Sequence, residues 1–291
     1  MKKICLLLSL FCSVALLAQD RFNPSGFDFL ENHKEDLFGT WKIKNMENTF
    51  KKVTEKIYMN ETEVTNQQYG YFLGYLLSQK NYDALLVAKA EKTDWRSLLP
   101  EGMKQYSDER IFKHGHSDAD AMPLQNIDYQ GAILFCKWLT DSYMKEDISK
   151  RKWKNVVFRL PTEQEWITAA SAGKTEAKYP WGNDSPRNTK GCYLSNFNCR
   201  NEPCSKCAQN AEGEQYIQDG GFFPVRADAY YPNALGLYGM SGNVAEMVQE
   251  KGIAKGGSWE DVPSECTIQA QKKYDKPSPA IGFRVIMEIL E

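Results

Sequence analysis

The chain has 291 residues, of which 42% are hydrophobic and 25% are charged, and its formal net charge is -2. This composition supplies enough apolar material for the core of a large globular domain and excludes a disordered chain. The near balance of acidic and basic residues gives no sign of a basic surface that would bind nucleic acid.

The first eighteen residues predict a signal peptide. Lys2 and Lys3 precede a continuous apolar run that ends in small residues, which places cleavage near Ala18. Neither Cys5 nor Cys12 follows a small residue, so we expect no lipid anchor. No second apolar stretch of spanning length follows, so we expect no transmembrane segment. Loss of the two lysines changes the net charge to about -4.

Residues 19–50 are polar and aperiodic, and we interpret them as an N-terminal arm ahead of a domain at 51–291. The stretch "KIYMNETEVT" alternates like a half-buried strand. Thr65 can cap a helix that begins at Asn66 and places four apolar residues on one face, namely Tyr69, Phe72, Leu73 and Leu76. A strand that leads into a helix is therefore expected.

The segment from Lys80 to Pro123 has little periodicity, and its composition predicts an ordered loop with short helical pieces. His114 and His116 lie within it. Two histidines one residue apart can chelate a metal, but no acidic or sulfur partner stands at a recognisable spacing. The favoured interpretation is a pair of surface loop residues.

Two further helices are predicted from their caps. Asp128 can cap a helix whose buried face carries Cys136 as a small core residue. Thr162 and Glu165 have the spacing of a capping box, directly after an apolar strand that ends at Pro161. That helix is expected to end by Gly173, and the chain from there to Ser258 reads as loops rich in Gly, Asn, Pro and aromatic residues.

Four cysteines fall within sixteen residues with the spacing C-x6-C-x4-C-x2-C, namely Cys192, Cys199, Cys204 and Cys207. Two disulfides are favoured because the chain is predicted to be exported. A zinc knuckle is the alternative. Of the three possible pairings we favour Cys199 with Cys204 and Cys192 with Cys207, which nests a short loop inside a longer one.

Seven ordered motifs carry a family resemblance: "NETEVTNQQYGYFL", "MPLQNIDYQGAILFCKWL", "RLPTEQEW", "YPWGND", "YYPNALGLYGMSGNVAEM", "KGGSW" and "IGFR". From about Ile57 to the C-terminus the sequence resembles the formylglycine-generating enzyme (sulfatase-modifying factor) family. The resemblance implies an α+β fold, a single compact formylglycine-generating-enzyme-like (C-type-lectin-like) domain with little regular secondary structure. Many members bind calcium.

Enzymes of the family convert a sulfatase cysteine to formylglycine with dioxygen and a copper ion held by two cysteines just after the "GGS" motif. Counting from Ser258, those two positions are Asp261 and Cys266 here. Copper in its reduced state prefers a pair of thiolates, so a carboxylate is a poor replacement. Ala245 and Glu265 also replace an expected tryptophan and tyrosine. Ser258, Asp261 and Cys266 are therefore expected to be vestigial, with no catalytic residue and no copper.

The resemblance also implies two calcium sites. The first maps onto an asparagine, a carbonyl, an aspartate and a further carbonyl, namely Asn196, Phe197, Asp219 and Gly221. The second maps onto two carbonyls and a carboxylate, namely Gly242, Val244 and Glu246. It is the weaker of the two, because its additional asparagine has become Gly239.

Within the family, "KGCYLSNFN", "DGGFFPVRADAYYPN", "GNVAE" and "GGSWEDV" resemble the non-catalytic branch of gliding-motility and type IX secretion lipoproteins. The missing lipidation motif departs from that branch. The sequence thus predicts an exported binding component of a bacterial envelope assembly, located in the periplasm, at the outer membrane or at the cell surface, with an envelope or secretion-machinery partner. Its oligomeric state is open. The alternatives are an oxidoreductase that uses Cys266 and a carbohydrate or peptide binder.

Overall fold

Two four-stranded sheets lie at the centre of the computed structural model, which describes residues 43–91, 93–99, 119–174, 176–198 and 223–290. The first sheet has the order β1-β2-β8-β3, with neighbours antiparallel, and consists of β1 (Phe50–Lys52), β2 (Ile57–Asn60), β8 (Ile286–Ile289) and β3 (Val156–Arg159). The second has the order β6-β5-β4-β7 and consists of β6 (Gln271–Lys273), β5 (Ile253–Lys255), β4 (Ala245–Met247) and β7 (Ile281–Phe283). In this second sheet β4 and β7 are parallel and the other pairs are antiparallel.

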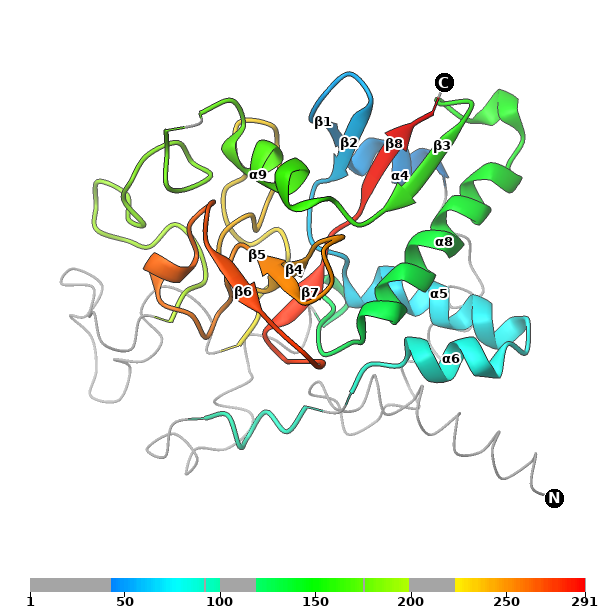
Figure 1. The fold of residues 1–291 in the computed structure, drawn as a ribbon, viewed down its shortest axis with the longest axis horizontal. Coiled ribbons are helices and arrows are strands. Elements are labelled where there is room, and N and C mark those ends of the chain that lie inside the picture. The colour runs from blue at the N-terminus through cyan, green and yellow to red at the C-terminus, as the bar shows by residue number, and fades with distance from the viewer. Residues whose placement is uncertain (1–42, 92, 100–118, 175, 199–222, 291) are drawn as a thin grey trace.

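Helices lie on both faces of the first sheet. Figure 1 shows α8 (Tyr129–Lys145) beside β3, with α5 (Asn66–Ser78) and α6 (Tyr82–Ala88) grouped against α8. Trp166 of α9 (Glu163–Ser171) packs on the other face, against Ile57 and Ile286. The remaining helices of the described residues are α4 (Ile43–Thr49) and the 3₁₀ turns η2 (Ala119–Ala121), η3 (Ile148–Lys150) and η4 (Pro263–Glu265). The strands are only three or four residues long, so loops make up much of the described chain.

The three predicted helix starts are confirmed. Thr65 and Gln68 form a capping box at α5, and Thr162 and Glu165 form another at α9. The Asp128 side chain accepts a hydrogen bond from the backbone of Gln130 at α8. These caps satisfy backbone N–H groups that lack partners in the first turn of a helix, which is why such residues mark helix starts in a sequence.

The helices and the sheets share a large apolar core. Tyr69 and Phe72 of α5 contact Phe135 of α8 through their rings, and Cys136 of α8 is buried in the same cluster, as predicted for a small core residue. A second cluster surrounds Trp166 of α9 and includes Ile57, Met240 and Ile286. Residues of both sheets thus contribute to the apolar core.

The packed domain begins before residue 51. Met46 of α4 and Phe50 of β1 are buried in the core, and the Tyr143 hydroxyl donates a hydrogen bond to Glu47. The last residues of the segment predicted as an arm, 46–50, therefore pack against the domain.

The loop segments are fixed by side chains, as their composition predicted. Asn233 illustrates this, because its amide donates to the carbonyl of Ala169 while its oxygen accepts from the backbone of Leu235 and Leu237. The segment 80–123 contains the expected short helical pieces, α6 and η2, but His114 and His116 lie outside the described residues. Within the described ranges, no helix has the length and apolar character needed to cross a bilayer.

Candidate functional site

The segment that follows β5 and includes η4 brings Ser258, Asp261 and Cys266 together. Gly256 and Gly257 begin this segment with φ values of 86° and 66°, a backbone region that favours glycine. A Cβ atom at Gly257 would also overlap the sulfur of Cys266. The "GGS" motif is thus explained by backbone conformation and by the close approach of Cys266.

The Asp261 carboxylate accepts hydrogen bonds from side chains of the protein itself. Lys272 of β6 donates to both of its oxygens at 2.7 Å, and the Ser258 hydroxyl donates to one of them at 2.6 Å. Lys272 also contacts Glu260 at 2.9 Å. Burial opposes the charge of Lys272, but its hydrogen bonds to Asp261 and Glu260 raise the pKa of its ammonium group above the ordinary value. Lys272 is therefore a cation and not a base.

Cys266 is fully buried. Its sulfur lies 3.8 Å from the carbonyl oxygen of Ser258 and 3.9 Å from that of Asp261, both backbone acceptors. Burial, and then the negative charge of Asp261, raise the pKa of the thiol above its ordinary value. A protonated, buried thiol is a weak nucleophile and a weak metal ligand.

These residues do not fit the copper ion that the resemblance implies. One donor is a carboxylate already neutralised by a lysine, and the other is a thiol held in its protonated form. Cys136 does not supply the missing second thiol, because it lies in the helical core cluster, whereas Cys266 packs with Tyr179, Tyr193 and Phe197.

The positions of the expected tryptophan and tyrosine differ in exposure. Ala245 is buried in β4, and Glu265 is exposed in η4.

The first predicted calcium site fits the structure where it is described. The Asn196 side chain is buried, and its amide nitrogen donates to the carbonyl of Phe223 at 3.0 Å. Its side-chain oxygen has no hydrogen-bond partner among the described residues. A buried oxygen of this kind suits a hard cation such as calcium. Phe197 follows it in the chain, while Asp219 and Gly221 lie outside the described residues.

The second predicted calcium site does not fit. Both oxygens of Glu246 accept hydrogen bonds from Arg284, at 2.7 to 3.1 Å, and one also accepts from the indole of Trp166. A Cβ atom at Gly239 would lie 2.6 Å from the carboxylate oxygens of Glu63, so Glu63 fills the space of the missing asparagine. Gly242 and Val244 are buried, and a Cβ atom at Gly242 would meet the carbonyl of Asn196. The guanidinium group of Arg284 thus supplies the positive charge for Glu246.

Three important side chains were missed by sequence reasoning: Glu63, Lys272 and Arg284. Arg284 and Glu63 lie within quoted motifs, "IGFR" and "NETEVT", but nothing in either motif pairs them. The Nη2 atom of Arg284 lies 4.0 Å from the Oε2 atom of Glu63, and neither side chain is exposed. No feature of the sequence pointed to Lys272, because its approach to Asp261 depends on the pairing of β6 with β5.

The cysteine cluster is described only in part. Cys192 is half-buried, and its backbone N–H donates to the side chain of Asn188. Cys199, Cys204 and Cys207 lie outside the described residues, so the two disulfides stay a prediction.

The fold and the sequence define a mixed α+β domain of the formylglycine-generating-enzyme kind. The chain belongs to the sulfatase-modifying factor enzyme 1-like domain family, whose model matches residues 37–289. This confirms the predicted family and fold class.

The chain is similar to two curated relatives and, in fold, to one solved structure. The formylglycine-generating enzyme of Thermomonospora curvata is 37% identical over 125 residues, which are 43% of this chain and 35% of that protein. The inactive C-alpha-formylglycine-generating enzyme 2 of Mus musculus is 31% identical over 181 residues, 56% of this chain and 48% of that protein. The chain therefore spans less than half the length of these relatives. The crystal structure of CarF is 20% identical, covers 80% of this chain and 86% of its own, and has a TM-score of 0.50, which supports the fold alone.

Proposed function

We propose that the protein is an exported, non-catalytic member of its family that acts by binding, as a structural or accessory component of a bacterial cell-envelope assembly of the type IX secretion or gliding kind. The observation that carries the non-catalytic part is the Asp261–Lys272 ion pair. It lies where the resemblance places a copper thiolate, and the adjacent Cys266 is buried. One of the relatives is named as inactive, and this supports the same proposal.

A copper-binding measurement tests this part. The purified full chain should fail to remove Cu(I) from a colourimetric chelator, because a neutralised carboxylate and a protonated thiol are poor ligands for a soft cation. The double variant Asp261→Cys, Lys272→Met restores two thiols and removes the competing ammonium, and it should compete with the chelator. Competition by the native chain, lost in Cys266→Ser, would favour the oxidoreductase alternative.

The envelope role rests on the predicted signal peptide and on the motifs shared with the gliding and secretion branch. Its test is to produce the full chain in a bacterium with two membranes, separate the cell fractions and cross-link intact cells. The proposal expects the chain in the envelope fraction, shortened near residue 18 and cross-linked to a defined envelope protein. An uncleaved chain in the cytoplasm would contradict export, and a processed chain that cross-links to nothing would contradict an assembly role.

A further inference from the structure

The basic loop, residues 148–154, lies in the connection between α8 and β3. It contains Lys150, Arg151, Lys152 and Lys154 and no acidic residue, whereas the whole chain has a formal net charge of -2. Such local segregation of positive charge creates a potential that attracts anions, whatever the net charge of the protein. The loop is therefore a candidate surface for a negatively charged partner.

The fold holds the basic loop in place. Trp153 is buried, and its ring contacts that of Tyr58 with 5.0 Å between ring centroids. The Arg151 guanidinium donates to the carbonyl of Lys154 at 3.0 Å and lies 5.6 Å from the centroid of the Tyr143 ring. Arg151 and Trp153 thus fasten the loop to the protein, and its lysines are presented on a fixed surface.

The lysines of the basic loop are exposed and unpaired. Among the described residues, none of the three has a carboxylate within ion-pair distance. The cations of the neighbouring strands differ, because Lys51, Lys52 and Arg159 each form an ion pair with a glutamate. The Lys152 ammonium lies 4.5 Å from the centroid of the Trp153 ring, a contact that leaves its charge in place. These lysines keep N–H donors for an external anion.

Two exposed aliphatic side chains adjoin these lysines. Ile148 begins the loop and is 56% exposed, the largest value for a large aliphatic side chain among the described residues. Leu290, which is 44% exposed, follows β8, and its backbone N–H donates to the carbonyl of Asn155, next to Lys154. Figure 1 shows the end of β8 and the connection from α8 to β3 at the same edge of the molecule. Exposed cations and exposed aliphatic groups thus lie at one edge of the fold.

This combination is typical of a surface that docks on an anionic membrane. On such a membrane, lysine ammonium groups contact headgroup phosphates while an aliphatic tip enters the apolar boundary. The long stem of lysine suits this arrangement, because it covers apolar surface and still places its charge in the polar layer. The phosphates of a nucleic acid would also attract the lysines, but they offer nothing that buries an exposed isoleucine.

We infer that the basic loop, together with Ile148 and Leu290, docks the protein on an anionic phospholipid surface. The inference deepens the proposed envelope role, on which it rests, by naming the component of the envelope that this edge of the fold contacts. The contact is peripheral and reversible, since it consists of surface charge and two aliphatic tips.

Vesicle flotation tests this contact with the purified full chain. The chain should float with vesicles of phosphatidylcholine and phosphatidylglycerol and should not float with phosphatidylcholine alone, and added salt should release it. The triple variant Lys150→Gln, Lys152→Gln, Lys154→Gln should weaken binding at least tenfold, because each lysine near an anionic surface contributes about fivefold. A native chain that binds no anionic vesicle, or a triple variant that binds as well as the native chain, would overturn the inference.

A second triple variant, Lys89→Gln, Lys273→Gln, Lys276→Gln, is the matched control. It removes the same charge from three exposed lysines outside the basic loop. It should bind the anionic vesicles within twofold of the native chain. An equal loss of binding in both triple variants would show that net charge alone attracts the chain, and it would overturn the basic loop as the docking surface.

Ile148→Ser tests the aliphatic part of the surface. It keeps every charge and should weaken vesicle binding at least threefold, whereas Leu86→Ser, at a 49% exposed position on α6, should leave binding unchanged. Circular dichroism and melting confirm that each variant is folded. Binding of a DNA duplex with the same lysine dependence, but without vesicle binding, would overturn a lipid surface.

The lipid contact and the envelope role can fail separately. Envelope cross-linking by a chain that binds no vesicle would overturn this surface and leave the proposed function intact. Vesicle binding by a chain that stays uncleaved in the cytoplasm would contradict the proposed export and support this surface.

Discussion

The carboxylate of Asp261 and the ammonium of Lys272 form a two-pronged ion pair, with both carboxylate oxygens 2.7 Å from the lysine nitrogen. The side chains are 15% and 22% exposed, so the pair is largely shielded from water. Each charge satisfies the other, and the Ser258 hydroxyl completes the set. A position that the resemblance assigns to metal binding has become part of the structural framework.

Lys272→Met should destabilise the protein by about 1–3 kcal/mol, because it leaves a shielded carboxylate without its main hydrogen-bond donor. Asp261→Asn should also destabilise, and the double variant should lose less than the sum of the two. Urea denaturation of the four proteins measures this as a double-mutant cycle. Fully additive losses would show that the pair contributes no coupling energy.

Glu63 should make the free energy of unfolding depend on pH. Burial raises the pKa of its carboxyl group to about 8, with the nearby charge of Glu246 acting in the same direction and Arg284 opposing it. The folded state then holds a proton that the unfolded state releases, so the free energy of unfolding should fall as the pH rises from about 4.5 to 8, by at most about 1.4 kcal/mol per pH unit. Urea denaturation at a series of pH values measures this slope.

Glu63→Gln carries no ionisable group at this position and should flatten that slope while the fold is kept. Glu61→Gln is the matched control, since Glu61 is 30% exposed and paired with Lys51, and it should leave the slope unchanged. An equal slope in the native chain and in Glu63→Gln would show that Glu63 is ionised in the folded state.

Calcium should raise the melting temperature, because a ligand that binds only the folded state stabilises it, by about 2.7 kcal/mol at 100 times its dissociation constant. Asn196→Ala and Asp219→Ala should each remove the response to added calcium and to a chelator. Asp275→Asn, at an exposed aspartate outside the site, should keep the response. A melting temperature of the native chain that stays the same with and without calcium would refute this site.

The four clustered cysteines should form two disulfides. Mass spectrometry of the exported protein, alkylated without reduction, should show Cys192, Cys199, Cys204 and Cys207 blocked, with the buried Cys136 alkylated only after denaturation. Each bridge should stabilise by about 2–4 kcal/mol through restriction of the unfolded chain. Alkylation of all four cysteines in the native protein would refute the disulfides, and a stoichiometric zinc ion that a chelator removes would favour the zinc alternative.

The features that could be predicted from the sequence are local or carried by the family motifs. The caps at Thr65, Asp128 and Thr162 were found because a cap and its helix lie within a few residues. The fold class followed from the ordered motifs. The Asp261 position was located by its distance from Ser258, and the structure then showed how the carboxylate is held.

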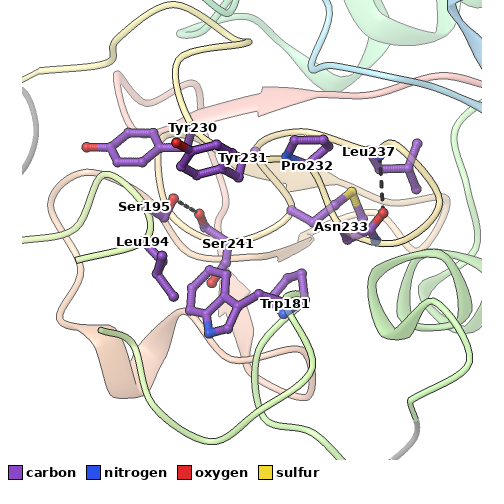
Figure 2. A pocket seen from close by; sticks show the side chains of 12 residues that line it. Trp181, Leu194, Ser195, Tyr230, Tyr231, Pro232, Asn233, Leu237 and Ser241 are labelled. Carbon is purple, nitrogen blue, oxygen red and sulfur yellow. Dashed lines mark hydrogen bonds between the residues drawn. The ribbon is translucent and has the colours of Figure 1, made fainter. Parts of the chain in front are cut away.

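The features that were missed depend on contacts between distant segments. Arg284 donates to the carbonyl of Asn60, 224 positions away, and Glu63 receives a hydrogen bond from Asn243, 180 positions away. No periodicity connects such positions. A small pocket between Trp181 and Tyr231 (Figure 2) is also built by loops, whose course is set by individual side-chain contacts and not by a repeating pattern.

We propose that this domain binds a partner and does not oxidise thiols. The most direct measurement incubates the purified full chain with copper, a reductant and a cysteine-containing sulfatase peptide, and follows the peptide by mass spectrometry, with an active formylglycine-generating enzyme as the positive control. We expect an unchanged cysteine, because Asp261 is held by Lys272 and the Cys266 thiol is buried. An aldehyde product that disappears in Cys266→Ser would contradict this proposal.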